Sequence, residues 1–103
     1  MIRHTILFTL KTNVSAKEVN QLVANMLTLK EKLPGILNIM GGACDFHEAT
    51  QSKPFTHGFS IDFKDQASLN QFFHDPITHP VKNEIIDAAV GGHDGIIGFN
   101  FMT

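Results

Sequence analysis

Hydrophobic residues along this chain change their spacing from one segment to the next. In segments 2–8 and 55–63 they recur at every second position, which is typical of strands that bury one face. The apolar segment 96–101 is short and follows a glycine-rich stretch, so it also fits a strand. Three strands are expected from these patterns.

A fourth strand is predicted over segment 36–46, although its pattern is interrupted. It contains the adjacent residues Gly41 and Gly42, which predict a bulge or a close approach of another part of the chain. Segment 47–54 is polar, and we expect it to be a loop.

Helical spacing dominates the segment between the first two strands. Ser15 and Glu18 have the capping-box arrangement that begins many helices. The apolar residues that follow recur every three or four positions as far as Leu33, as in an amphipathic helix. Pro34 and Gly35 end this helix.

The second half of the chain predicts two helices in series. Asp65 can cap a short helix, and Asp75 followed by Pro76 can begin the next one. The second helix is expected to end at the glycine pair 91–92. The apolar stripes of the two helices are Leu69, Phe72 and Phe73 for the first, and Ile77, Val81, Ile85 and Ala88 for the second.

The predicted order of elements is βαββααβ. This order is typical of a ferredoxin-like α+β sandwich, in which helices cover one face of a four-stranded antiparallel sheet. The chain has 103 residues and no repeat or linker. Residues 1–103 are therefore expected to form a single domain.

Two histidines interrupt otherwise apolar strand faces. His4 and His57 fall on the hydrophobic side of segments 2–8 and 55–63. An unpaired polar group in an apolar core costs about 1–3 kcal/mol, so each imidazole needs a partner or a wet cavity. The pair indicates a lined pocket between sheet and helices.

Composition narrows the classes of partner. The net charge is −2 and the basic residues are scattered, so no nucleic-acid surface is expected. No apolar run approaches the length of a membrane span and no signal peptide is recognisable, so a cytoplasmic location is expected. The single cysteine, Cys44, fits a reducing compartment and predicts a core-filling role.

Several segments together resemble the stress-responsive A/B barrel domain (Dabb) family. They are residues 2–8, 29–36, 55–59 and 76–79, and the resemblance extends over essentially the whole chain. It implies a homodimer in which two four-stranded sheets pack face to face as a dimeric α+β barrel. It also implies a cavity between each sheet and its own helices.

The second face of the predicted sheet also bears on this dimer. In segments 2–8 and 55–63 it carries small and mixed residues, which suit either water or another sheet. The resemblance favours the other sheet. A bulky charged residue at Gly58, which lies on this face, is then expected to disrupt the dimer.

One plant branch of the family consists of polyketide cyclases, which close a ring by an intramolecular aldol reaction. The resemblance assigns the general base of that branch to His79 and places His4 and His57 in the same pocket. The tyrosine that polarises the carbonyl in those enzymes falls on Phe72, and this chain contains no tyrosine. Phenylalanine has no hydroxyl group, so the cyclase mechanism cannot be transferred intact.

Two functions remain open, and with them the question of whether the chain is an enzyme. The first is a binding module whose apolar cavity holds a small hydrophobic or aromatic metabolite. The second is a cyclase-like lyase, in which His79 removes a proton next to a carbonyl and His57 donates a hydrogen bond to the enolate. The expected ligand-binding residues are His4, Ile6, Phe8, Phe59 and Phe72.

No metal or cofactor is expected. No two histidines have the spacing of a helix or strand metal site, and one cysteine cannot form a zinc cage. The sequence also lacks a phosphate loop and a dinucleotide fingerprint. Monooxygenases of the dimeric barrel superfamily often depend on tryptophan, which this chain lacks, so that class is disfavoured.

Overall fold

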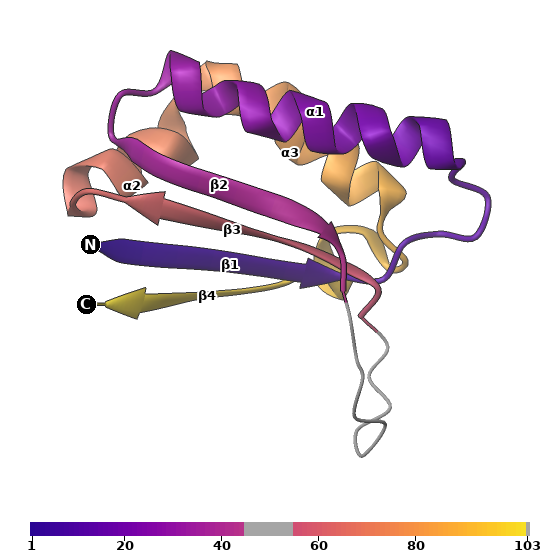
Figure 1. Ribbon diagram of the computed structural model, residues 1–103. Helices are drawn as coiled ribbons and strands as arrows, with labels where there is room; N and C mark the ends of the chain where they lie inside the picture. The colour runs from indigo at the N-terminus through magenta and orange to yellow at the C-terminus, as the bar shows by residue number, and fades with distance from the viewer. Residues whose placement is uncertain (45–54, 103) are drawn as a thin grey trace.

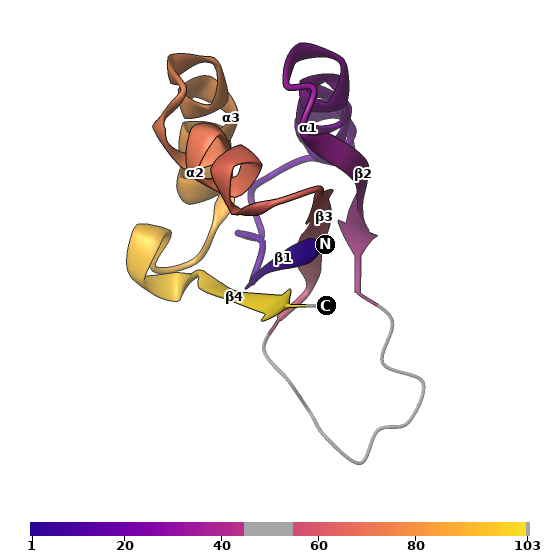
Figure 2. The same ribbon diagram turned by 90° about the vertical axis from the view of Figure 1, so that its left-hand side faces the viewer.

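One antiparallel sheet carries all helices of the described residues on a single face (Figure 1). The computed structural model describes residues 1–44 and 55–102. The strands are β1 (Ile2–Phe8), β2 (Ile36–Ala43), β3 (His57–Phe63) and β4 (Ile97–Met102), in the spatial order β2-β3-β1-β4. The helices are α1 (Ala16–Lys32), α2 (Gln66–His74) and α3 (His79–Ala88). Figure 2 shows α1 beside α3, with α2 in front of α3, all on the same side of the sheet. The expected α+β class, element order and antiparallel sheet are confirmed.

The predicted boundaries differ from the observed ones by a few residues. Within the described residues, β2 ends at Ala43 and β3 begins at His57, so both strands are shorter than predicted. The predicted loop 47–54 lies outside the described residues. Before α3, residues Pro76–Thr78 form a separate 3₁₀ turn, where the sequence pattern predicted one continuous helix.

The helix starts follow from side chains that satisfy exposed backbone N–H groups. The Ser15 hydroxyl accepts a hydrogen bond from the Glu18 backbone at 3.1 Å, as the capping box predicts. The Asp65 carboxylate accepts one from the Ser68 backbone at 2.9 Å and begins α2. The predicted N-terminal caps of these two helices are confirmed.

The hydrophobic core lies between the helices and the sheet. Its largest fully buried side chains come from β1, β3 and α1: Phe8, Phe63, Met26, Leu29 and Ile61. The alternation in β1 and β3 therefore places one face of each strand in this core.

Gly41 of β2 leaves room for an aromatic ring, whereas a Cβ atom on Gly42 would meet no described atom within 4 Å. A Cβ atom on Gly41 would lie 2.1 Å from the Cδ1 atom of Phe59, so any side chain there would displace the ring. The bulge of β2 lies elsewhere, between Ile36 and Asn38. Of the two expectations for the glycines, the close approach is the one that the structure shows.

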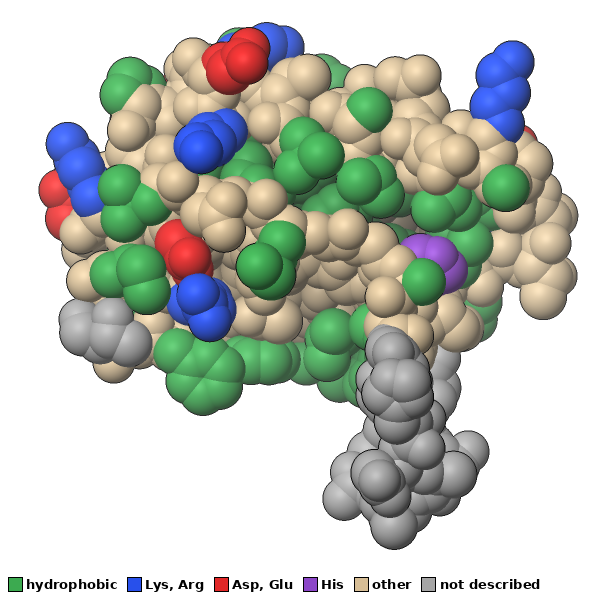
Figure 3. Space-filling model, in the orientation of Figure 1, with side chains coloured by type: hydrophobic (Ala, Val, Ile, Leu, Met, Phe, Trp, Pro, Cys, Tyr) green, Lys and Arg blue, Asp and Glu red, His purple; other side chains and the backbone are tan. Residues whose placement is uncertain are grey.

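The sheet face that points away from the helices is not covered by any described residue. Strand register places twelve residues on this outer face: Arg3, Thr5, Leu7, Asn38, Met40, Gly42, Gly58, Ser60, Asp62, Ile97, Phe99 and Phe101. Figure 3 shows hydrophobic side chains along the edge of the molecule where β4 lies. Phe99 and Phe101 are 38% and 58% exposed, although large aromatic residues are usually buried.

One ion pair crosses the outer face. The Arg3 guanidinium donates two hydrogen bonds to the carboxylate of Asp62, at 2.7 and 3.1 Å. These bonds hold the pKa of Asp62 below its usual range. The pair joins β1 to β3 near the end of the exposed sheet face at which β1 begins.

Candidate functional site

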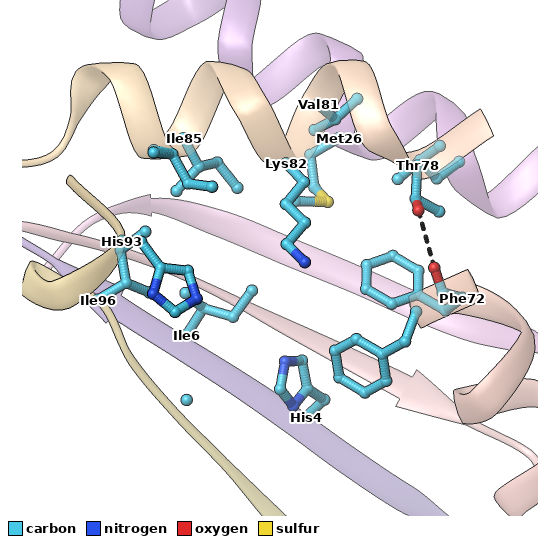
Figure 4. Close-up of a pocket in the computed structure, with 14 residues that line it drawn as sticks. His4, Ile6, Met26, Phe72, Thr78, Val81, Lys82, Ile85, His93 and Ile96 are labelled. Carbon is cyan, nitrogen blue, oxygen red and sulfur yellow. Dashed lines mark hydrogen bonds between the residues drawn. The ribbon is translucent and has the colours of Figure 1, made fainter. Parts of the chain in front are cut away.

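A cavity of about 240 Å³ opens between the sheet and α3 (Figure 4). It is larger than the cavity of about 150 Å³ that holds benzene in a protein core, and smaller than typical sites for drug-sized ligands. A molecule with one ring and short substituents would fit. The lining residues are His4, Ile6, Met26, Leu29, Phe72, Phe73, Thr78, Val81, Lys82, Ile85, Ile86, His93, Ile96 and Gly98.

His4 is the buried polar residue on the sheet side of this cavity. Its side chain stands on β1 directly opposite Asn100 of β4, and the residue is 7% exposed. The imidazole Nδ1 lies 2.6 Å from the Asn100 Oδ1 atom. Because an amide oxygen can only accept, Nδ1 carries the hydrogen and donates. The ring also meets that of Phe73 edge to face, with centroids 5.1 Å apart.

The protonation state of His4 follows from this environment. Burial lowers its pKa, and the hydrogen bond to Asn100 opposes the shift without reversing it. The imidazole is therefore neutral at pH 7, with its proton on Nδ1 and a lone pair on Nε2. Figure 4 shows a ring nitrogen of His4 facing the cavity on the side of Lys82. His4 can thus accept a proton or a hydrogen bond from a molecule in the cavity.

Three other polar side chains reach the lining. Lys82 extends from α3 toward the sheet, and its ammonium points into the cavity (Figure 4). His93 lies at the mouth, where its side chain is 79% exposed and 3.8 Å from the carboxylate of Asp94. Thr78 is already engaged, because its hydroxyl donates to the backbone carbonyl of Phe72 at 2.8 Å.

Of the predicted ligand-binding residues, the structure places His4, Ile6 and Phe72 on the cavity. Phe8 and Phe59 do not line it. They lie in the core and stack with ring centroids 6.4 Å apart.

The two histidines predicted to be catalytic do not line the cavity either. His57 lies at the far end of the sheet, with Nδ1 2.8 Å from the hydroxyl of Thr56 and its ring stacked on Phe8. His79 is exposed at the start of α3. Thr78 faces the core and is 3% exposed. Successive side chains are rotated by about 100° around a helix axis, so the side chain of His79 points away from the core. The expectation that His57 and His79 share one cavity is therefore wrong for this structure.

Sequence reasoning missed Lys82 and Asn100. Lys82 is four residues after Thr78 and four before Ile86, so all three share one helix face. That spacing was a usable signal, but a lone lysine usually points to solvent. Asn100 had no signal, because its contact with His4 depends on the register between β1 and β4.

Among the described residues, no group of three histidine, cysteine or acidic side chains lies close enough to hold a metal ion. In the same part of the chain, no helix is long and apolar enough to span a membrane.

The buried histidine predicts an acid-sensitive fold. Because burial lowers the pKa of His4 in the folded state, the unfolded chain binds protons more readily below its own pKa of about 6.5. The free energy of unfolding should therefore be highest above this pH and should fall as the pH drops below it. Urea unfolding at about pH 7.5 and about pH 5.5 should show this fall, and the fall should be smaller in His4→Gln. His57, whose pKa burial also lowers, should account for part of the remainder. An equal loss in wild type and variant would contradict the assignment to His4.

The sheet order, the one-sided helix layer and the cavity between them define an α+β protein of the ferredoxin-like type. The family model described as Stress responsive A/B Barrel Domain matches residues 2–93, and the chain belongs to this family. A search of curated proteins gives no sequence match.

Solved structures with the same fold include proteins of different activities. A dimeric ferredoxin-like protein from Jannaschia sp. CCS1 has 20% identity and a TM-score of 0.88, with 99% of this chain and 98% of that chain covered. Hydroxynitrile lyase from Passiflora edulis has 23% identity and a TM-score of 0.82, with coverage of 99% and 92%. SnoaB, a cofactor-independent oxygenase from Streptomyces nogalater, has 11% identity and a TM-score of 0.74, with coverage of 99% and 91%. At these identities the likeness establishes the fold.

Proposed function

We propose that this protein is a homodimeric barrel domain whose cavity binds a small molecule with one hydrophobic or aromatic ring. The observation that carries the proposal is the cavity itself, which is about 240 Å³ in volume and mostly apolar. A few polar groups in an apolar cleft are the usual composition of a small-molecule site. His4 supplies a hydrogen-bond acceptor in a fixed orientation, because Asn100 holds its Nδ1.

The outer face of the sheet supports the homodimer. It exposes Phe99, Phe101 and Met40 beside small residues, and a second copy of the same face would bury them. The Jannaschia protein of the same fold is described as dimeric.

A specific observation favours a second candidate, a lyase that transfers a proton at His4. A neutral imidazole held by an amide oxygen through Nδ1 has its Nε2 lone pair available as a general base. With a hydroxynitrile, Nε2 would take the hydroxyl proton while the bond from carbon to the nitrile breaks. The oxygen electrons would form the carbonyl, and cyanide would leave with the bond pair and receive the proton. The hydroxynitrile lyase among the structural neighbours suggests this substrate class.

Binding can be tested with meta-hydroxybenzyl alcohol, a neutral single-ring probe. At millimolar concentration it should shift the NMR resonances of His4 and Phe72. Ile86→Trp should abolish the shifts, because Ile86 is a half-buried lining residue and an indole there would fill the cavity. Leu27→Trp is the matched control, since Leu27 is 44% exposed on α1. Absence of binding to the wild type would refute the proposed cavity function.

Cyanide release from benzaldehyde cyanohydrin separates the two candidates. A lyase should release cyanide above the uncatalysed rate, and His4→Gln should lower that rate by about 10²–10⁴. His79→Gln should leave it unchanged, because His79 is exposed and does not line the cavity. Binding of the neutral probe without cyanide release would support the binding module.

A further inference from the structure

We propose that the cavity selects single-ring molecules that carry an anionic oxygen, and that Lys82 binds this oxygen. The proposal rests on the proposed function, because it names the ligand class of the same cavity. It concerns a residue to which neither the sequence patterns nor the family likeness gave a role.

Lys82 is the single formally charged side chain among the described lining residues. The lining contains no aspartate, glutamate or arginine, and no other lysine. Figure 4 shows the ammonium inside the space bounded by α3 and the sheet rather than directed to the outer surface of the helix. A lysine ammonium offers three donors and no acceptor, so it is suited to an anionic oxygen.

No neighbouring acid on the helix competes for this ammonium. Ion pairs within a helix form between residues three or four apart. For Lys82 these positions hold Thr78, His79, Ile85 and Ile86, and none is acidic. In the part of the chain that the structure describes, Lys82 takes part in no ion pair.

The nearest acid along α3 is also engaged elsewhere. Both carboxylate oxygens of Glu84 accept hydrogen bonds at 3.0 Å from the side-chain amide of Asn25 on α1. Glu84 therefore links α3 to α1 and does not neutralise Lys82. A ligand anion would meet an ammonium without an intramolecular partner.

The opposite side of the cavity adds a second requirement. His4 is neutral and presents the Nε2 lone pair, which repels an anion but accepts from a hydroxyl group. The anionic oxygen therefore belongs at Lys82, and a hydroxyl group on the ring would donate to His4. Because Lys82 is an exposed residue, water screens part of the attraction between its ammonium and an anion, and a modest gain in affinity is expected.

The test compares meta-hydroxybenzoate with meta-hydroxybenzyl alcohol, which share a ring and hydroxyl but differ in charge. Calorimetry or NMR titration should show tighter binding of the benzoate to the wild type. Lys82→Met should weaken benzoate binding by about tenfold and leave the affinity for the alcohol within about twofold. Lys82→Arg should retain most of the benzoate affinity, because it keeps the charge.

Lys30→Met is the matched control, since it removes the same charge from an exposed site on α1. It should leave both affinities unchanged. Equal loss of benzoate affinity in Lys82→Met and Lys30→Met would overturn the proposal, because net charge alone would then explain binding. Stronger binding of the alcohol to the wild type would also overturn it, while the cavity function would stand. Failure of both probes to bind would instead refute the proposed function on which the inference rests.

Discussion

Replacing Phe99 with aspartate is expected to convert the proposed dimer into a monomer. Phe99 lies near the middle of β4 on the outer face, opposite Thr5 of β1, and its ring meets that of Phe101. A two-fold interface contains each residue twice, so one substitution removes two phenyl rings. At about 1.5–3 kcal/mol for each buried ring, the dissociation constant should rise a hundredfold or more. Light scattering across a dilution series should show the monomer mass.

Leu27→Asp is the control, because Leu27 is similarly exposed but lies on α1 in the helix layer. It should leave the mass unchanged. A wild type that is monomeric at all concentrations would contradict the dimer itself.

Gly58 is less suitable for this test than its place on the outer face suggests. A Cβ atom there would lie 2.7 Å from the backbone oxygen of Ile6, within the sheet itself. A charged residue at Gly58 would therefore distort the pairing of β1 with β3, and its effect on the dimer could not be separated from damage to the fold.

The second large effect is expected in the core, at Phe63. This residue is fully buried between the sheet and the helices, and its ring meets that of Phe72 with centroids 5.4 Å apart. Phe63→Ala should lower the free energy of unfolding by about 3–5 kcal/mol, because it removes buried apolar surface and leaves a cavity. This is a large part of the stability of about 5–15 kcal/mol typical of a domain. At fixed protein concentration, the melting temperature should fall by at least about 12 °C.

Phe73→Ala provides the comparison within the same aromatic cluster. Phe73 is 40% exposed and contacts the rings of His4 and Phe72. Phe73→Ala should lower the free energy of unfolding by less than half as much as Phe63→Ala. The reason is that the Phe73 side chain buries less of its surface when the protein folds. Equal losses would show that burial does not determine stability in this cluster.

The sequence predicted the fold well because the period of its hydrophobic residues changes at each element. The alternation in β1 and β3 and the caps at Ser15 and Asp65 are local signals, and all appear in the structure. The turn Pro76–Thr78 was not predicted. It depends on the Thr78 hydroxyl reaching the carbonyl of Phe72, a contact that hydrophobic spacing does not encode.

The site was predicted only in part, because it depends on which residues meet across strands and helices. His4 was expected to need a partner, and its partner is Asn100, which a pattern within one segment cannot identify. The role of His79 came from the family resemblance, and the place of His57 in a pocket was also inferred from strand alternation. His79 is exposed, and His57 lies at the start of β3, so neither lines the cavity.

The register of β4 determines both the orientation of His4 and the apolar character of the outer sheet face. Asn100 points toward the helices and orients His4, while its neighbours Phe99 and Phe101 point to the opposite side. Side chains alternate along a strand, so a shift of β4 by one residue would exchange its two faces. A single-residue deletion just before β4 would therefore aim phenylalanine at the imidazole and asparagine at the exposed face. This one deletion would remove both the hydrogen-bond partner of His4 and the apolar surface of the outer face.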